Sequence, residues 1–275
     1  MKFSSLPVSF YADFAAGRRT LADWFNFAGT IGLDGADVSV AHLTELSSSY
    51  LGSLRSQADD AGVQILMIAT YSDFTHPNAD ERRRQQEEVR DYINAARLLG
   101  SSFVRVTAGQ NHPGLVRGEA IDWAVEGLTA CLSAADAAGV TLLYENHTKG
   151  SVWEFVDFSQ PADIYLEIVE RTANSGLLLL FDTANNLVLN DDPVEILQQV
   201  KDRVAVIHTN DIVQAGHFEP TIHGTGVAPI REIFDCLSQF GFDGWISVEE
   251  ASKSGEEGFR TAATHAKQLW AESSL

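Results

Sequence analysis

The sequence predicts an α/β protein that forms one (β/α)8 barrel, and three observations support this fold. The chain has 275 residues, close to the roughly 250 typical of such a barrel. Short apolar runs alternate with helix-like stretches eight times, which indicates a parallel sheet. A polar residue stands at the end of each of the last four apolar runs, where the strands of a barrel would converge. No change in composition divides the chain, so we expect a single domain over residues 1–275. A doubly wound open sheet is the alternative, but eight units favour closure.

In the first half of the chain, several helical patterns begin at recognisable signals. Thr20 is placed to cap the first helix, and Asn78 and Glu81 have the spacing of a capping box before a long charged helix. The predicted strands are residues 7–11, a weak signal, and then 35–40, 63–70 and 103–109. The predicted helices are residues 21–32, 43–62, 81–100 and 120–139.

The second half repeats this alternation with stronger strand signals. Each apolar run is too short for a helix and follows a glycine or another turn-forming residue. The predicted strands are residues 140–146, 177–183, 204–211 and 245–251. The predicted helices are residues 161–172, 193–202, 229–241 and 256–274.

Four polar residues stand where the last four apolar runs end. They are Glu145 after VTLLY, Asp182 after LLLLF, His208 after VAVI and Glu249 after WISV. Burying a lone carboxylate or imidazole there costs several kcal/mol unless it is paired or bound to a metal. On a closed barrel the four would converge at the C-terminal face. Such a set suits Mn²⁺, Mg²⁺, Co²⁺ or Zn²⁺. The alternative is four unrelated structural residues.

Charge and cysteine content argue against several classes of partner. Lys and Arg number 19 against 38 Asp and Glu, a formal net charge of -19, and an acidic surface repels phosphate backbones. Cys131 and Cys236 lie in helix-like segments, so no disulfide framework is expected. The N-terminus lacks a signal-peptide core, and no run of about 20 apolar residues occurs. We expect a cytoplasmic protein without nucleic-acid or membrane partners. Its oligomeric state, a homo-oligomer included, stays open.

Motifs around these strand ends resemble those of a known group of enzymes. They are YENH (144–147), FDTAN (181–185), HTND (208–211) followed by HGTG (223–226), and FDGWISVEE (242–250). With these motifs in this order, the chain resembles the xylose isomerase-like TIM-barrel superfamily, the sugar phosphate isomerase/epimerase group. That group includes ketose 3-epimerases, hydroxypyruvate isomerases, inosose and dehydroshikimate dehydratases, and metal-dependent endonucleases. The resemblance therefore predicts the fold and the presence of a metal ion more specifically than it predicts the substrate.

The resemblance implies that Glu145, Asp182, His208 and Glu249 bind one divalent ion, with Mn²⁺ favoured. Glu249 is preferred to its neighbour Glu250, because successive strand residues point to opposite sides. In the family pattern the first acidic residue after the strand is the ligand.

Four further residues are candidates for substrate binding. His147 lies two residues after Glu145 and could bind a substrate hydroxyl or orient that carboxylate. Relatives carry His or Asn at the position of Asn185 to contact substrate. His217 and His223 lie in the loop after the seventh strand. For the histidines, the alternative is a loop residue bonded to backbone or solvent. The GTG sequence lacks the strand and helix of a dinucleotide fingerprint, so no nicotinamide cofactor is expected.

The ligand set and the resemblance imply a metal-dependent isomerase or epimerase acting on a small sugar or polyhydroxylated carbonyl compound. The ion would polarise the carbonyl. Glu145 and Glu249 would then remove and return a proton through a metal-held cis-enediolate. Expulsion of a β-hydroxyl from the same enediolate would give a lyase of the inosose or 3-dehydroshikimate dehydratase type.

A third class is the endonuclease IV-like phosphodiesterase, which uses three zinc ions. Asn185 stands where that branch needs a histidine, and Thr221 stands where it needs an aspartate. The acidic charge also argues against it. A non-catalytic sugar-binding barrel is a further alternative, but an intact ligand set argues against that as well.

Overall fold

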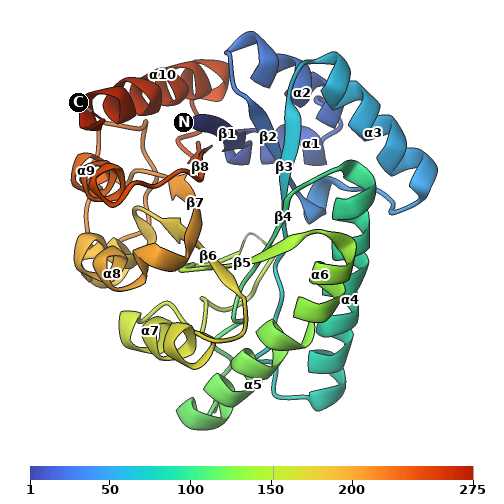
Figure 1. The fold of residues 1–275 in the computed structure, drawn as a ribbon, viewed down its shortest axis with the longest axis vertical. Coiled ribbons are helices and arrows are strands. Elements are labelled where there is room, and N and C mark those ends of the chain that lie inside the picture. Colours follow the sequence, from blue (N-terminus) through green and yellow to red (C-terminus); the bar gives the residue numbers. More distant parts are fainter. Residues whose placement is uncertain (151, 275) are drawn as a thin grey trace.

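A computed structural model describes residues 1–150 and 152–274, and Figure 1 shows a ring of strands surrounded by helices. The eight strands pair in parallel and form a nearly closed barrel in the order β1-β8-β7-β6-β5-β4-β3-β2. They are β1 (Lys2–Leu6), β2 (Gly35–Ser39), β3 (Gln64–Ala69), β4 (Phe103–Val106), β5 (Thr141–Glu145), β6 (Leu178–Asp182), β7 (Val204–Thr209) and β8 (Trp245–Glu249). The predicted (β/α)8 barrel is therefore confirmed.

Helices connect the strands on the outside of the barrel (Figure 1). They are α1 (Tyr11–Ala15), α2 (Leu21–Thr30), α3 (Ser48–Asp60), α4 (Ala79–Leu99), α5 (Arg117–Ala130), α6 (Leu132–Ala138), α7 (Ala162–Arg171), α8 (Pro193–Val200), α9 (Ile230–Phe240) and α10 (Gly255–Ser273). Short 3-10 helices are η1 (Val8–Phe10), η2 (Val40–His42), η3 (Asn185–Leu189) and η4 (Lys201–Arg203). None of these described helices is long and apolar enough to cross a membrane.

The predicted caps at Thr20 and Asn78 are present, but Glu81 does not complete the predicted capping box, because the amide of Asn78 donates to Nδ1 of His76 (3.1 Å) and Glu81 pairs with Arg84. Thr20 and Asp23 form a reciprocal capping box at the start of α2. The side chain of Asn78 accepts a hydrogen bond from the amide of Asp80 (2.8 Å) at the start of α4. Because each cap satisfies an amide that the helix cannot, these residues fix where the two helices begin.

The first predicted strand, residues 7–11, is wrong. Strand β1 is the preceding segment Lys2–Leu6, and residues 8–15 form η1 and α1. Ser4 and Ser5 interrupt the apolar signal of β1 because both hydroxyls are buried with partners inside the fold. Pro7 has no amide hydrogen for the sheet, so the strand ends before it.

Two predicted helices also differ from the structure. The helix predicted over residues 120–139 is two helices, α5 and α6, which meet at Cys131. The helix predicted over residues 43–62 begins only at Ser48, because the side chain of Ser47 accepts a hydrogen bond from the amide of Tyr50 (3.3 Å) and caps it there.

An apolar layer fills the barrel beneath the polar strand ends. Side chains two positions apart on a strand share a face, so the residues two before Glu145, Asp182 and His208 also point inward. They belong to one buried cluster: Leu66, Met67, Leu143, Leu180 and Val206. The polar strand ends thus lie on an apolar floor that closes the barrel below them.

Candidate metal centre

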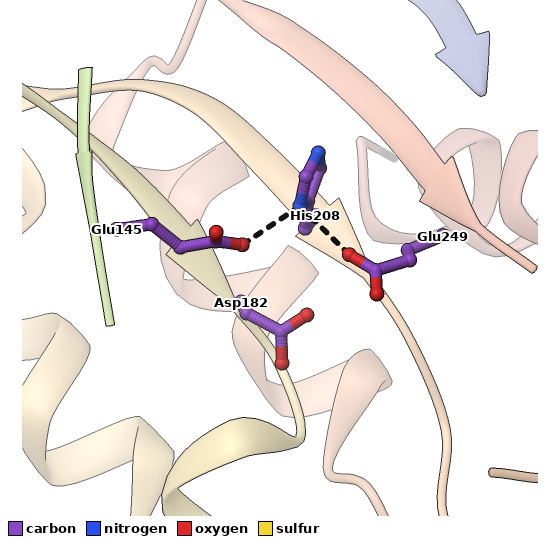
Figure 2. Close-up of side chains that lie close together, drawn as sticks. All are labelled: Glu145, Asp182, His208 and Glu249. Carbon is purple, nitrogen blue, oxygen red and sulfur yellow. Dashed lines mark hydrogen bonds and ion pairs between the residues drawn. The ribbon is translucent and has the colours of Figure 1, made fainter. Parts of the chain in front are cut away.

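The structure brings Glu145, Asp182, His208 and Glu249 together at the C-terminal face of the barrel. Each offers one ligand atom, and these atoms all lie within 4.8 Å of one another. Figure 2 shows the four side chains converging from neighbouring strands, β5 to β8. Within residues 1–150 and 152–274 this is the one group of three or more such side chains that could hold an ion.

The imidazole of His208 lies between two carboxylates. Its Nδ1 is 2.8 Å from Oε1 of Glu145 and 3.0 Å from Oε2 of Glu249 (Figure 2). Burial opposes a charge on the ring, but the attraction of the two glutamates outweighs it and raises the pKa of His208 well above its ordinary value. The centre therefore attracts positive charge strongly.

Asp182 is held rigidly at the end of β6. Its amide donates to Oδ1 of Asn146 (2.7 Å), and its own Oδ1 accepts hydrogen bonds from the amides of Ala184 (2.8 Å) and Asn185 (2.7 Å). Burial, and then repulsion from Glu249 and Glu145, raises the pKa of Asp182 well above its ordinary value. The loop thus fixes Oδ1, while Oδ2 accepts a longer hydrogen bond from Nδ2 of Asn210 (3.4 Å).

A buried arginine on β4 completes the centre, and the sequence analysis missed it. Arg105 is 2% exposed, and its Nε lies 3.3 Å from Oε2 of Glu145. Its guanidinium carbon lies 5.0 Å from the centroid of the Tyr71 ring. Burial alone would raise the pKa of Glu145, but Arg105 and His208 outweigh it and lower that pKa to about 2. A charged residue within the apolar run FVRV was the signal that could have revealed it.

The predicted substrate-binding residues fall into two places. His147 lies beside the centre: its charge acts on Glu145, and its ring packs edge-on against Trp153 with 5.5 Å between centroids. Its Nδ1 lies 3.7 Å from Oδ2 of Asp157. Asn185 is buried, and its Nδ2 donates to the carbonyl oxygen of Asn146 (3.0 Å), which shapes the loop around Asp182.

Neither of the two histidines after β7 belongs to the metal centre. His217 is exposed. His223 is buried, with Nε2 2.6 Å from Oγ1 of Thr209 and Nδ1 2.7 Å from Nδ1 of His265 on α10. Thr209 follows His208 on the strand and so points to the opposite side. This placement gives no support to the predicted substrate contacts of His217 and His223, which stay predictions.

Asp211 determines the shape of the loop that carries His223. Its Oδ2 accepts hydrogen bonds from the amides of Gly224 (2.9 Å) and Gly226 (2.8 Å), and its Oδ1 accepts from those of Ile212 and Ala228 (both 3.0 Å). Gly224 has φ +88°, a conformation that favours glycine. A single carboxylate therefore fastens both ends of this loop.

Glu249 and Glu250 point to opposite sides, as predicted. Glu249 joins the centre, and its side chain is 19% exposed. Glu250 instead accepts hydrogen bonds from the amide (3.0 Å) and the hydroxyl of Ser252. This orientation makes Glu249 the available ligand on β8.

The donor set fits a divalent cation. Donors at about 2.1 Å from an ion lie no more than about 4.2 Å apart, close to the spacing here. Three carboxylates and one imidazole also match the oxygen and nitrogen preferences of such ions. The raised pKa values of His208 and Asp182 show that the group favours added positive charge. We conclude that these residues could hold one metal ion.

The chain matches the xylose isomerase-like TIM barrel family over residues 25–271 and belongs to that family. It is 26% identical over 211 residues to the "Putative hydroxypyruvate isomerase" of Streptomyces coelicolor, covering 73% of this chain and 74% of that protein. It is 23% identical over 239 residues to an inosose dehydratase of Clostridium botulinum, covering 75% and 76%. Matches to two inosose dehydratases of Lacticaseibacillus casei span 44% of those proteins.

Solved structures share the whole fold at lower identity. The IOLI protein with a bound zinc atom superposes with a TM-score of 0.80 at 18% identity, covering 99% of both chains. A D-psicose 3-epimerase superposes with a TM-score of 0.78 at 14% identity, covering 98% of this chain and 99% of that one. Homologues and structural neighbours thus include isomerases, epimerases and dehydratases.

Proposed function

We propose that this protein is a divalent-metal-dependent isomerase or epimerase of a small sugar or other polyhydroxylated carbonyl compound. The convergence of Glu145, Asp182, His208 and Glu249 at the barrel mouth carries the proposal. Two of the carboxylates lie on either side of His208 Nδ1, so two proton-transfer groups can border one substrate. The family and the Streptomyces relative support this class of reaction.

The four ligands would hold the ion, Mn²⁺ by our proposal, and a bound ion would polarise a carbonyl and acidify the neighbouring C–H bond. Glu249 would remove that proton, because it is the ligand carboxylate with the greater exposure. Glu249 would pass that proton to water, and Glu145, after taking a proton from water, would deliver it to the substrate. The neighbouring Arg105 would then favour the return of Glu145 to its ionised form. Return to the opposite face of the same carbon gives epimerisation, and return to the next carbon gives isomerisation.

One cavity has walls that contact His147, although none of the four candidate ligands is among its lining residues. This cavity of about 470 Å³ is lined in part by Tyr71 and Trp153, the two aromatic residues that pack around His147. We propose that His147 binds a substrate hydroxyl at the edge of this cavity.

A lyase of the inosose or 3-dehydroshikimate dehydratase type is the second candidate. The similarity to the C. botulinum inosose dehydratase, over three quarters of both chains, favours it. The same proton abstraction by Glu249 would begin that reaction. The two candidates differ only in whether a β-hydroxyl leaves before the proton returns.

The test uses the full chain, stripped with chelator and reloaded with Mn²⁺, Mg²⁺, Co²⁺ or Zn²⁺. We expect one ion per chain by elemental analysis. Isomerisation or epimerisation of ketoses or hydroxypyruvate in D₂O should place deuterium on the carbon next to the carbonyl. With inososes or dehydroshikimate, loss or gain of an enone absorbance would identify the lyase. Failure to bind any of the four metals, or full isomerisation without deuterium, would contradict the mechanism, and three metals per chain would revive the nuclease alternative.

A further inference from the structure

A second polar group lies buried beside the metal centre, where β1, β2 and β8 meet. It consists of Asp37 on β2, Ser4 on β1 and Ser247 on β8, all fully buried. Oδ2 of Asp37 accepts hydrogen bonds from the hydroxyls of Ser247 and Ser4, the latter at 3.3 Å. The proposed reaction uses none of these residues, so their burial needs a separate explanation.

The strand register places this group level with His208. Ser247 is the pairing partner of His208 in the β7–β8 ladder, and Ser4 is the partner of Ser247 in the β1–β8 ladder. Asp37 bonds to both serines and so lies at the same height in the barrel. The His208 ring is among the charges that act on the Asp37 carboxylate.

Two buried polar atoms at this height have no hydrogen-bond partner among the described residues. They are Oδ1 of Asp37 and Nε2 of His208. Figure 2 shows that Nδ1 of His208 faces the glutamates while the second ring nitrogen points away from them. A buried polar atom without a partner is unfavourable. Oδ1 of Asp37 is an acceptor. If Nδ1 of His208 binds a metal, the ring carries its proton on Nε2, which is then a donor, so the two atoms can satisfy each other.

We propose that Asp37 accepts the Nε2–H of His208, directly or through one buried water, and thereby holds the ring with the Nδ1 lone pair facing the metal. Metal-binding histidines commonly donate their other ring N–H to a carboxylate, which fixes the tautomer and strengthens the ligand. Asp37 is then a positioning residue rather than a catalytic one. The inference rests on the ligand role of His208 in the proposed function.

The experiment measures Mn²⁺ affinity of the metal-free full chain by competition with a chromophoric chelator. Asp37→Asn should weaken binding about 10- to 100-fold, the range typical of a lost outer partner. The matched control is Ser247→Ala, which removes a bond to the same carboxylate but leaves Oδ1 in place. It should change affinity by less than about threefold. Equal effects of the two variants would mean that Asp37 only joins the strands.

A measurement on the unaltered protein covers the case in which Asp37→Asn does not fold. With Zn²⁺ bound and histidines labelled with ¹⁵N, the Nε2–H proton of His208 should be visible by NMR and exchange slowly with water. A fast-exchanging Nε2–H, or a proton on Nδ1, would overturn the role of Asp37 but leave the proposed function of the protein standing. If the unaltered protein binds neither Mn²⁺ nor Zn²⁺, the proposed function fails with it.

Discussion

Two histidines and two glutamates near strands β7 and β8 lie in opposite electrostatic settings. On the inner side, His208 and Glu249 belong to a group of charges that attracts a cation. On the outer side, His223 bonds to Thr209 and His265, and Glu250 bonds to Ser252. All four side chains are largely buried, so burial does not distinguish them. The neighbouring charges do. One step along the chain from His208 or Glu249 leads to Thr209 or Glu250, whose side chains point to the outer side.

The pKa directions of the two histidines show this difference. Both rings lose hydration on burial, which disfavours the charged form. For His223 that effect, reinforced by His265, lowers the pKa to about 3. For His208 the attraction of Glu145 and Glu249 outweighs it and raises the pKa. A buried histidine is therefore a candidate metal ligand here only where carboxylates surround it.

The largest expected effect comes from the two glutamates of β8. Glu249→Gln should reduce turnover at least about a thousandfold, within the range for a lost proton-transfer group, and weaken metal binding. Glu250→Gln should retain most activity, because that side chain faces Ser252. Steady-state kinetics and metal titration on both variants test this. Equal losses, or the reverse order, would remove the distinction between the two sides.

The next effect concerns charge balance on the inner side. Arg105→Met should lower the free energy of unfolding by about 3 kcal/mol, since it leaves Glu145 buried without its cation. Urea denaturation of the metal-free protein measures this. The control is Arg117→Met on the surface, where ion pairs with Asp163 and Glu167 contribute about 1 kcal/mol or less. Similar losses from both variants would show that Glu145 does not depend on Arg105.

The smallest effect tests the outer side through pH. The pKa of His223 is lower in the folded protein than in the unfolded chain, so as pH falls the unfolded chain binds the proton first. Its contribution to stability is complete above about pH 6.5 and declines as pH falls towards 3. When the pH is lowered from 7 to 5, the free energy of unfolding should fall less in His223→Gln than in the unaltered protein, and the two decreases should differ by about 1–2 kcal/mol.

The control for that measurement is His217→Gln, because His217 is exposed in the same loop. Its pH dependence should match that of the unaltered protein. If His223→Gln also matches it, the two histidine environments do not differ as the structure indicates.

Alternation of apolar runs and helical patterns was sufficient to predict strands β2 to β8, because each is buried on both faces. It failed at β1, where Ser4 and Ser5 are buried by virtue of specific hydroxyl partners that hydropathy cannot reveal. The grouping of the four candidate ligands was also predictable. Each ends or nearly ends a strand, and strand ends converge on a barrel.

Arg105 and Asp37 escaped the sequence analysis because they lie within strands, where each was treated as part of an apolar run. Charged residues inside FVRV and GADVS are the signals that could have found them. The direction of His223 could not be predicted at all. It depends on Asp211, whose four hydrogen bonds fix a loop with no periodic pattern.

The pairing of β1 with β8 has a consequence for how the protein is made. The hydroxyl of Ser5 bonds to the carbonyl oxygen of Val248, 243 positions later in the chain. During synthesis β1 must therefore wait for the last strand, and contacts this distant in sequence form slowly. Glu249 is on that same last strand. Glu145, Asp182 and His208 leave the ribosome earlier, and the complete ligand set exists only once the ring has closed.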